Sequence, residues 1–219
     1  MLWEDDEPKP ALRPADAVEV CFPLVGRVLP SDYCVPLALA LTPLLEPDVD
    51  PRRTGVRVLH VPTSGNGWYR GRGEVIHVSR RVQLALRVHR DACEEVAGLA
   101  GAELNLEGVE LKLGAPRVAE LVAAEPLYAH RVIGTEGEGE ESFLTAAHRR
   151  LGEMGVTPRR MLCGREERLE TPDGVLTVRS LLIDGMGAEP GLAVQSHGLG
   201  EGRHWGCGLF VPHKAVAPV

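Results

Sequence analysis

The chain has 219 residues, a hydrophobic content of 44% and a formal net charge of −7 at neutral pH. This length suits one large domain or two small ones, and no apolar run approaches the ~18 residues of a membrane-spanning helix. The acidic start, MLWEDDEPKP, is unlike a signal peptide. The five cysteines are scattered and form no Cys-x-x-Cys pair. Together these features predict reduced thiols and a cytoplasmic protein without a membrane partner.

The negative charge is concentrated in two short segments. Residues 1–10 hold four acids and one lysine, and residues 136–141 hold four acids, which together account for the whole net charge. Residues 52–90 instead hold nine arginines and a single acid, Glu74. Such an excess of arginine suits a polyphosphate partner, because guanidinium groups make bidentate phosphate contacts. A solvated basic face is the alternative.

The first half of the chain predicts a mixture of strands and helices. A helix is expected within 29–46, with Asp32 as its N-cap and Pro43 near its end, and a second helix over 91–101. A hairpin over 102–116 is expected to turn at Glu107–Gly108. A glycine-rich basic loop is expected over 63–73. Strands are expected at 17–26, 55–61, 74–79 and 82–88.

The second half repeats this order. Apolar residues recur at spacings of three and four over 140–155, which predicts an amphipathic helix. The residues of its apolar face are Phe143, Leu144, Ala147, Leu151 and Met154. A shorter helix is expected at 187–198. Strands are expected at 127–134, 159–164, 174–185 and 209–216.

Two successive β-α-β-β-α-β units predict an α+β fold of two tandem ferredoxin-like (RRM-like) halves with a C-terminal glycine-rich loop. We place an acidic tail at 1–16, the first half at 17–123 and the second half at 124–219. This scaffold is common among RNA-binding proteins, but it does not fix a function by itself.

The segment GLGEGRHWGCG, residues 198–208, has the form G-h-G-x5-G-h-G, where h is an apolar residue. Glycine lets backbone amides approach an anion closely. The segment lacks the Gly-Lys-Ser/Thr end of a P-loop and the third glycine of a dinucleotide fingerprint. Its composition alone leaves a tight turn without a ligand as an equal alternative.

This segment, between the last predicted helix and the last predicted strand, resembles the signature glycine-rich loop of the CRISPR-associated RAMP superfamily. In particular, it resembles the repeat-cleaving endoribonucleases that process CRISPR RNA precursors. Further segments resemble the MYXAN-subtype branch of these enzymes, and the similarity extends over nearly the whole chain from Val18. These segments are SRRVQLALRV (79–88), LGAPRV (113–118), LYAH (127–130) and LCGR (162–165).

The resemblance implies an endoribonuclease that needs no metal or other cofactor and cuts once at the 3′ side of the repeat stem. The RNA's own 2′-OH attacks the adjacent phosphate and leaves a 2′,3′-cyclic phosphate and a 5′-OH. This chemistry asks for a base, an acid and cations that stabilise the phosphorane. The implied partners are the CRISPR repeat RNA and other CRISPR effector subunits. A non-catalytic RNA-binding subunit is the first alternative, and an enzyme for a small phosphorylated metabolite is the second.

Tyr33 and His60 are the expected catalytic residues. The family often has a histidine base at the start of the first helix, where this sequence has Tyr33, which can position the 2′-OH or act as the acid. His60 resembles part of an "IHP"-like segment of the same branch, and imidazole titrates near neutral pH. Purely structural roles at a helix start and a strand end are the alternatives for these two residues.

RNA contacts are expected from the basic segment, the glycine-rich loop and the C-terminus, namely from Arg70, Arg72, Arg80, Arg81, Gly200, Gly202, Arg203, His204, Trp205 and Lys214. Trp205 can stack on a base, and its alternative role is packing between the halves. The spacing of His197, His204, Cys207 and His213 matches no closed zinc pattern, so no metal site is expected.

Overall fold

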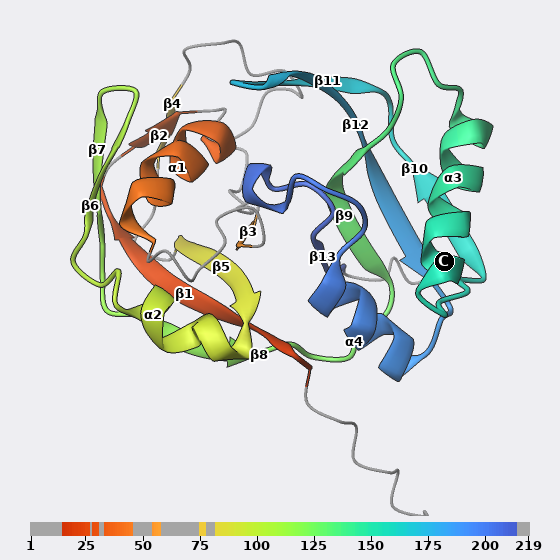
Figure 1. The fold of residues 1–219 in the computed structure, drawn as a ribbon, viewed down its shortest axis with the longest axis horizontal. Helices are drawn as coiled ribbons and strands as arrows, with labels where there is room; N and C mark the ends of the chain where they lie inside the picture. Colours follow the sequence, from red (N-terminus) through yellow and green to blue (C-terminus); the bar gives the residue numbers. More distant parts are fainter. Residues whose placement is uncertain are drawn as a thin grey trace, which may run out of the picture.

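A computed structural model of the chain describes residues 15–26, 28–30, 33–45, 54–57, 75–77 (as backbone) and 82–213. Within these ranges, two antiparallel sheets lie on opposite sides of the molecule (Figure 1). The chain passes from the first sheet to the second between Glu120 and Leu127. The glycine-rich loop lies between the sheets, beside the first helix (Figure 1).

The first sheet is built around strand β1. Its strands are β1 (Ala17–Val25), β3 (Gly55–Val56), β5 (Gln83–His89), β6 (Glu103–Leu106), β7 (Val109–Leu113) and β8 (Arg117–Glu120). Strand β5 pairs with one side of β1, and the other side is shared by β8 near the start of β1 and β7 near its end. Val20 and Leu86 are register partners on β1 and β5 and are both fully buried. Register partners on neighbouring strands point to the same face of a sheet, so both side chains lie in the same core.

Two short helices cover this sheet. Helix α1 (Cys34–Leu41) is followed directly by a 3-10 turn, η1 (Thr42–Leu44), so Pro43 lies just past the helix end as predicted. The expected N-cap, Asp32, lies outside the described residues. The second helix is shorter than predicted: a 3-10 turn, η2 (Arg90–Ala92), leads into α2 (Cys93–Ala97). Glycine is a poor helix former, and Gly98 is where α2 ends.

The hairpin prediction is confirmed. Strands β6 and β7 pair with each other, and the turn between them has Glu107 at φ 54° and Gly108 at φ 91°. Positive φ at both central residues is typical of a tight type I′ turn. However, β8 rather than the hairpin lies along the start of β1. Strand β8 was missed because it is an exposed edge strand with no apolar alternation. A separate ribbon pairs β2 (Val28–Pro30) with β4 (Val75–His77).

The second sheet has the strand order β10-β12-β9-β13, and β11 pairs with the start of β12. Its strands are β9 (Leu127–Ile133), β10 (Arg160–Cys163), β11 (Glu167–Thr171), β12 (Gly174–Asp184) and β13 (Phe210–Pro212). The predicted strands at 127–134, 159–164 and 174–185 are confirmed, whereas β11 was missed because only Leu169 in it is buried.

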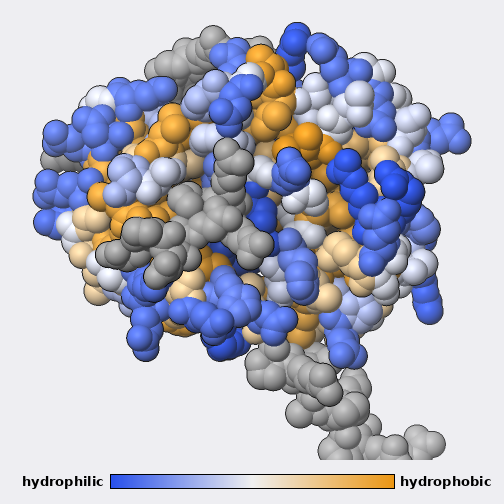
Figure 2. Space-filling model, in the orientation of Figure 1, coloured by the Kyte–Doolittle hydropathy of each residue, from blue (hydrophilic) through white to orange (hydrophobic). Residues whose placement is uncertain are grey.

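Two helices belong to this second half: α3 (Glu140–Glu153) and α4 (Ala188–His197). The predicted apolar face of α3 is confirmed, because Phe143, Ala147 and Leu151 are buried. Hydrophilic residues dominate the side of the molecule where α3 lies (Figure 2). No helix in the described part of the chain has the length and apolar character needed to cross a bilayer. All five cysteines lie in the described part of the chain, and none of them forms a disulfide there.

Candidate nucleic-acid interface

The two ends of the glycine-rich loop form a narrow stem. The amide of Leu199 donates to the carbonyl oxygen of Gly208 at 2.9 Å, and the amide of Gly208 donates to the carbonyl of Arg131 on β9 at 2.7 Å. Gly198 has φ +72° and Gly208 has φ +67°. A Cβ on Gly198 would lie 2.7 Å from the carbonyl oxygen of Gly208. The stem therefore needs glycine both for its left-handed backbone and for the close approach of its two sides.

The middle of the loop folds into a single 3-10 turn, η3 (Arg203–Trp205), between Gly202 and Gly206. Trp205 is 7% exposed and packs in a cluster with residues of α1, β11 and β12. Its neighbours are Val35, Ala38, Leu169, Val178 and Cys207. The structure thus favours packing between the halves over base stacking for Trp205. The half-buried ring of His204 lies 4.1 Å from the indole, centroid to centroid.

The guanidinium of Arg203 turns back onto helix α4. Its Nη1 donates to the carbonyl oxygen of Ser196 at 3.0 Å and to that of His197. Carbonyls in the last turn of a helix lack partners within the helix, and a cation there also opposes the helix dipole. Burial, assisted by the charge of Arg87, lowers the pKa of Arg203 to about 10. Arg203 was expected to contact RNA, and in the structure its Nη1 caps α4.

Tyr33 lies directly before helix α1. Its carbonyl oxygen accepts the amide of Leu37 at 2.8 Å, and its side chain is 4% exposed within the core of the first half. Helix α1 contacts η3, so the fold brings the helix that Tyr33 precedes to the glycine-rich loop. The structure therefore places this candidate near the loop but inside the core rather than on the surface.

Of the remaining predicted site residues, the structure describes only Gly200 and Gly202. Gly200 is exposed and Gly202 is partly exposed, with φ of +79° and +75°. The other candidates lie outside the described residues: His60, Arg70, Arg72, Arg80, Arg81 and Lys214. No group of three or more His, Cys, Asp and Glu side chains able to hold a metal ion occurs in the ranges that the structure describes.

The basic segment carries less free charge than its sequence indicates. Arg57 and Arg87 both pair with Glu19 on β1, at 3.4 and 2.7 Å. Arg90 pairs with Glu120 on β8 at 2.7 Å, and this hydrogen-bonded partner lowers the pKa of Glu120. The acids come from strands outside the window 52–90, so counting charges within the window overestimated the electrostatic footprint. Arg87 is also 1% exposed, which removes it from any phosphate surface.

An exposed arginine that the sequence analysis did not single out lies beside the loop. A Cβ on Gly200 would be 3.4 Å from Nη1 of Arg150, near the end of α3. Its neighbour Arg149 instead pairs with Glu153, one helical turn further on, at 3.2 Å. The arginine doublet was visible in the sequence, but only the fold places one of the two side chains at the loop.

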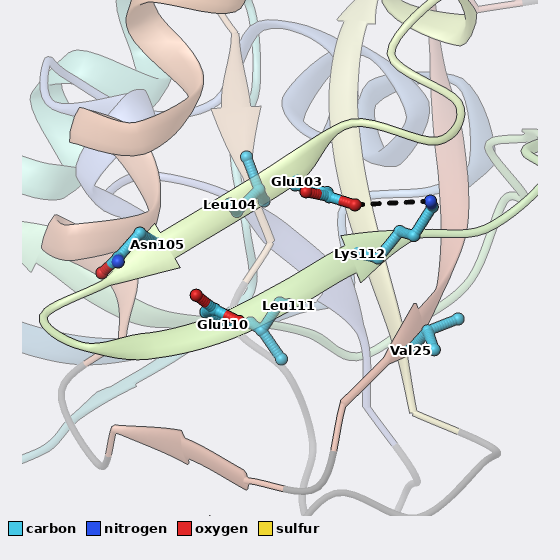
Figure 3. Close-up of a pocket in the computed structure, with 7 residues that line it drawn as sticks. All are labelled: Val25, Glu103, Leu104, Asn105, Glu110, Leu111 and Lys112. Carbon is cyan, nitrogen blue, oxygen red and sulfur yellow. Dashed lines mark hydrogen bonds and ion pairs between the residues drawn. The ribbon is translucent and has the colours of Figure 1, made fainter.

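A pocket of about 280 Å³ lies along the hairpin β6–β7 (Figure 3), and none of its lining residues belongs to the glycine-rich loop. Its lining residues are Val25, Glu103, Leu104, Asn105, Glu110, Leu111 and Lys112. Lys112 lies 3.5 Å from Glu103, which offsets its charge, and Glu110 adds a further carboxylate. Because carboxylates repel phosphate, this pocket does not suit the backbone of a nucleic acid.

The comparison with known proteins agrees with the family resemblance that the glycine-rich loop indicated. The model of the family described as "Cas6 Crispr" matches residues 18–215. The chain belongs to the Cas6 family. A CRISPR-associated endonuclease Cas6 of Myxococcus xanthus is 31% identical over 203 residues, which cover 92% of this chain and 84% of that protein. The predicted resemblance is thus confirmed, and the matched relative is a CRISPR-associated endonuclease.

Solved structures agree on the fold. A CRISPR associated protein Cas6 superposes with a TM-score of 0.60 at 12% identity, over 90% of this chain and 100% of that one. A Cas6-related protein from Pyrococcus furiosus superposes with a TM-score of 0.51 at 14% identity, over 89% and 98% of the two chains. At these identities the likeness concerns the Cas6 fold alone.

Proposed function

We propose that this Cas6 family member cleaves CRISPR precursor RNA within the repeat. The 2′-OH attacks the adjacent phosphate without a metal ion and leaves a 2′,3′-cyclic phosphate and a 5′-OH. The observation that carries the proposal is the closed glycine-rich loop, whose η3 turn contacts helix α1 of the first half. Retention of the repeat hairpin and association with other CRISPR effector subunits belong to the same proposal.

The fold proposed for this function is two ferredoxin-like halves, at 17–123 and 124–219, preceded by a tail at 1–16. The strand order supports it. In the first sheet β8, β1, β5 and β3 are neighbours in that order, and in the second sheet β13, β9, β12 and β10 are. When these four strands are numbered 1 to 4 along the chain within each half, both orders read 4-1-3-2. This is the order of a β-α-β-β-α-β unit folded into one antiparallel sheet.

For the chemistry we propose His60 as the base and the hydroxyl of Tyr33 as the group that positions the 2′-OH or protonates the leaving oxygen. An imidazole with its ordinary pKa of ~6.5 accepts a proton at neutral pH, whereas a phenol with a pKa of ~10 donates a hydrogen bond there. Phosphate contacts are assigned to Arg70, Arg72, Arg80, Arg81 and Lys214, with Arg150 added from the structure. Cations near the phosphorane stabilise its developing charge.

A second function is favoured by one observation. Tyr33 stands where the family often has a histidine, and its side chain is 4% exposed. If the phenol stays in the core, the same fold binds repeat RNA without cutting it. The chain is then a non-catalytic RNA-binding subunit of a CRISPR effector complex.

The two functions are separated by incubating the protein in EDTA with a 5′-labelled RNA copied from the CRISPR repeat of the same genome. The enzyme gives one cut, and the upstream product resists phosphatase until acid opens its cyclic phosphate. The matched control carries a single 2′-deoxy nucleotide before the scissile phosphate, which removes the nucleophile and must abolish the cut. Binding without cleavage assigns the non-catalytic function. Cleavage that needs added Mg²⁺ contradicts the mechanism, and no binding at all contradicts both functions.

A further inference from the structure

Arg87 occupies an unusual place for a charged residue. It lies on strand β5 of the first sheet, between Glu19 on β1 and Gly55 on β3 as its register partners. Its side chain is 1% exposed, although charged residues are rarely buried so completely unless they are paired. Sequence position alone had grouped Arg87 with the cations of the basic segment, so its burial calls for a different role.

The guanidinium of Arg87 crosses from the first half of the chain to the second. Its Nη1 donates to the carbonyl oxygens of Gln195 at 2.9 Å and Phe210 at 2.6 Å, and its Nη2 donates to Oε1 of Glu19 at 2.7 Å. Gln195 lies in the last turns of α4, three residues before the glycine-rich loop, and Phe210 begins β13, two residues after it. A single nitrogen of the first half therefore holds the chain on both sides of the loop.

Glu19 offsets the cost of burying this cation. Burial lowers the pKa of Arg87, and the adjacent carboxylate opposes that effect. Glu19 is 12% exposed and also lies 3.4 Å from Nε of Arg57, so it joins two arginines of the first half. A charged donor makes stronger hydrogen bonds to carbonyl oxygens than a neutral one does. The Arg87–Glu19 pair thus makes charge-assisted hydrogen bonds to the chain on both sides of the loop, and it leaves no unpaired charge in the interior.

A steric contact supports the same junction. A Cβ on Gly55 would lie 2.7 Å from Cδ2 of Leu209, the residue that directly follows the loop. Glycine at this position lets β3 pack closely against the end of the loop. The loop is therefore fixed to the first sheet by a polar contact and an apolar contact that lie side by side.

We propose that Arg87 is the positioning residue of the glycine-rich loop: it fixes the loop against the first half, so that RNA held by the loop meets the catalytic groups of the first half. This proposal rests on the proposed RNA cleavage. Arg87 touches no RNA, because it is buried. Its loss therefore acts on the rate of the cut rather than on the contacts that bind the RNA.

The test compares two double variants of the full chain. Arg87→Met with Glu19→Gln removes the hold and both buried charges together. Arg90→Met with Glu120→Gln is the matched control, because this pair joins the residue that directly follows β5 to an acid of the first sheet but lies on the surface. For each protein the single-turnover rate constant at saturating RNA and the Kd are measured with the labelled repeat RNA. We expect the rate constant of the first variant to fall at least tenfold with Kd changed less than threefold, and the control to match the wild type.

Hydrogen exchange measures the hold itself, independently of any activity. The amides of Leu199 and Gly208 are expected to exchange at least tenfold faster in the Arg87→Met, Glu19→Gln variant, while those of helix α3 keep their wild-type rates. If the double variant does not fold, Arg87→Lys keeps the charge opposite Glu19 but replaces the planar fork by one nitrogen, and the loop amides must then exchange at least threefold faster.

The outcomes separate this proposal from the proposed function. Unchanged exchange of the loop amides overturns the hold, whatever the RNA does. Faster exchange with an unchanged cleavage rate, or with a raised Kd in place of a lowered rate, overturns the positioning role. If the wild type does not cut the repeat RNA, the proposed cleavage fails, and the exchange experiment still decides whether Arg87 fixes the loop.

Discussion

Arg203 and Ser196 are joined by a hydrogen bond of 3.0 Å from Nη1 to a carbonyl oxygen, at the point where α4 gives way to the glycine-rich loop. A hydrogen bond from a charged donor contributes about 2 kcal/mol to stability. Arg203→Met is therefore expected to lower the free energy of unfolding in urea by about 2 kcal/mol. The salt dependence of RNA binding should stay as in the wild type. A salt slope reduced by one phosphate contact would instead support the RNA contact predicted from the sequence.

A side chain in the stem of the loop should lower the free energy of unfolding. Gly208→Ala must place a Cβ against the carbonyl of Leu199 at a φ of +67°, so we expect a loss of about 2 kcal/mol or more. Gly152→Ala is the matched control, because nothing lies within 4 Å of its added Cβ inside α3. That variant should gain about 0.5–1 kcal/mol. Urea unfolding of both variants measures the difference, and equal effects would contradict this view of the stem.

Arg150 should contact RNA and Arg149 should not. Arg150→Ala is expected to weaken repeat binding at all salt concentrations and to reduce the slope of log K against log salt by about 0.7–0.9, the contribution of one phosphate. Arg149→Ala should leave the slope unchanged, because Glu153 already neutralises that side chain. Filter binding at four salt concentrations compares the two. Equal slopes for both variants would remove Arg150 from the interface.

His60→Ala should abolish cleavage while Kd stays close to the wild-type value, because a base acts on the reacting proton rather than on the RNA backbone. Tyr33→Phe removes only the phenolic oxygen and keeps the packing of the ring in the core. We expect its single-turnover rate constant to fall between tenfold and a hundredfold. An unaltered rate constant in Tyr33→Phe would leave that residue a purely structural role.

Stability should depend on the thiol of Cys207 in alkaline solution. Burial raises its pKa from the ordinary 9.0 to about 12, with Arg131 opposing and Cys34 adding to the shift. Between pH 9 and 12 the unfolded chain releases this proton and the folded chain keeps it. The free energy of unfolding therefore falls as the pH rises through that window, by about 1.4 kcal/mol per pH unit. Urea unfolding of Cys207→Ala should show a shallower decline than that of Cys93→Ala, whose thiol is only partly buried. Parallel curves would contradict a protonated thiol in the fold.

Local sequence patterns predicted the elements whose burial follows a clear period. Helix α3 and strand β12 were found because apolar residues recur along them, and the hairpin was found from Glu107–Gly108. Strands β8 and β11 were missed because each is an edge strand with little buried apolar surface. Their position depends on β1 and β12, with which they pair, and not on their own residues.

The candidate site was harder to predict because its contacts join distant parts of the chain. The glycine spacing identified the loop, but the carbonyl partners of Arg87 lie 108 and 123 positions away along the chain. No window of the sequence contains both ends of such a contact. The same limit affected the charge count, in which Glu19 and Glu120 stood outside the segment that they neutralise.

The steric demands of the stem also bear on how the glycine pattern persists in a family. The backbone of the loop itself disfavours any side chain at Gly198 and Gly208. The presence of glycine at these two positions therefore needs no ligand to explain it. A descendant that lost its catalytic base would still lose stability if it replaced either glycine. Selection for folding alone is therefore enough to keep these two glycines in such a descendant. The glycine pattern therefore indicates the family and the fold of the loop. Active members of the family must be distinguished by the residues around α1, which faces the loop.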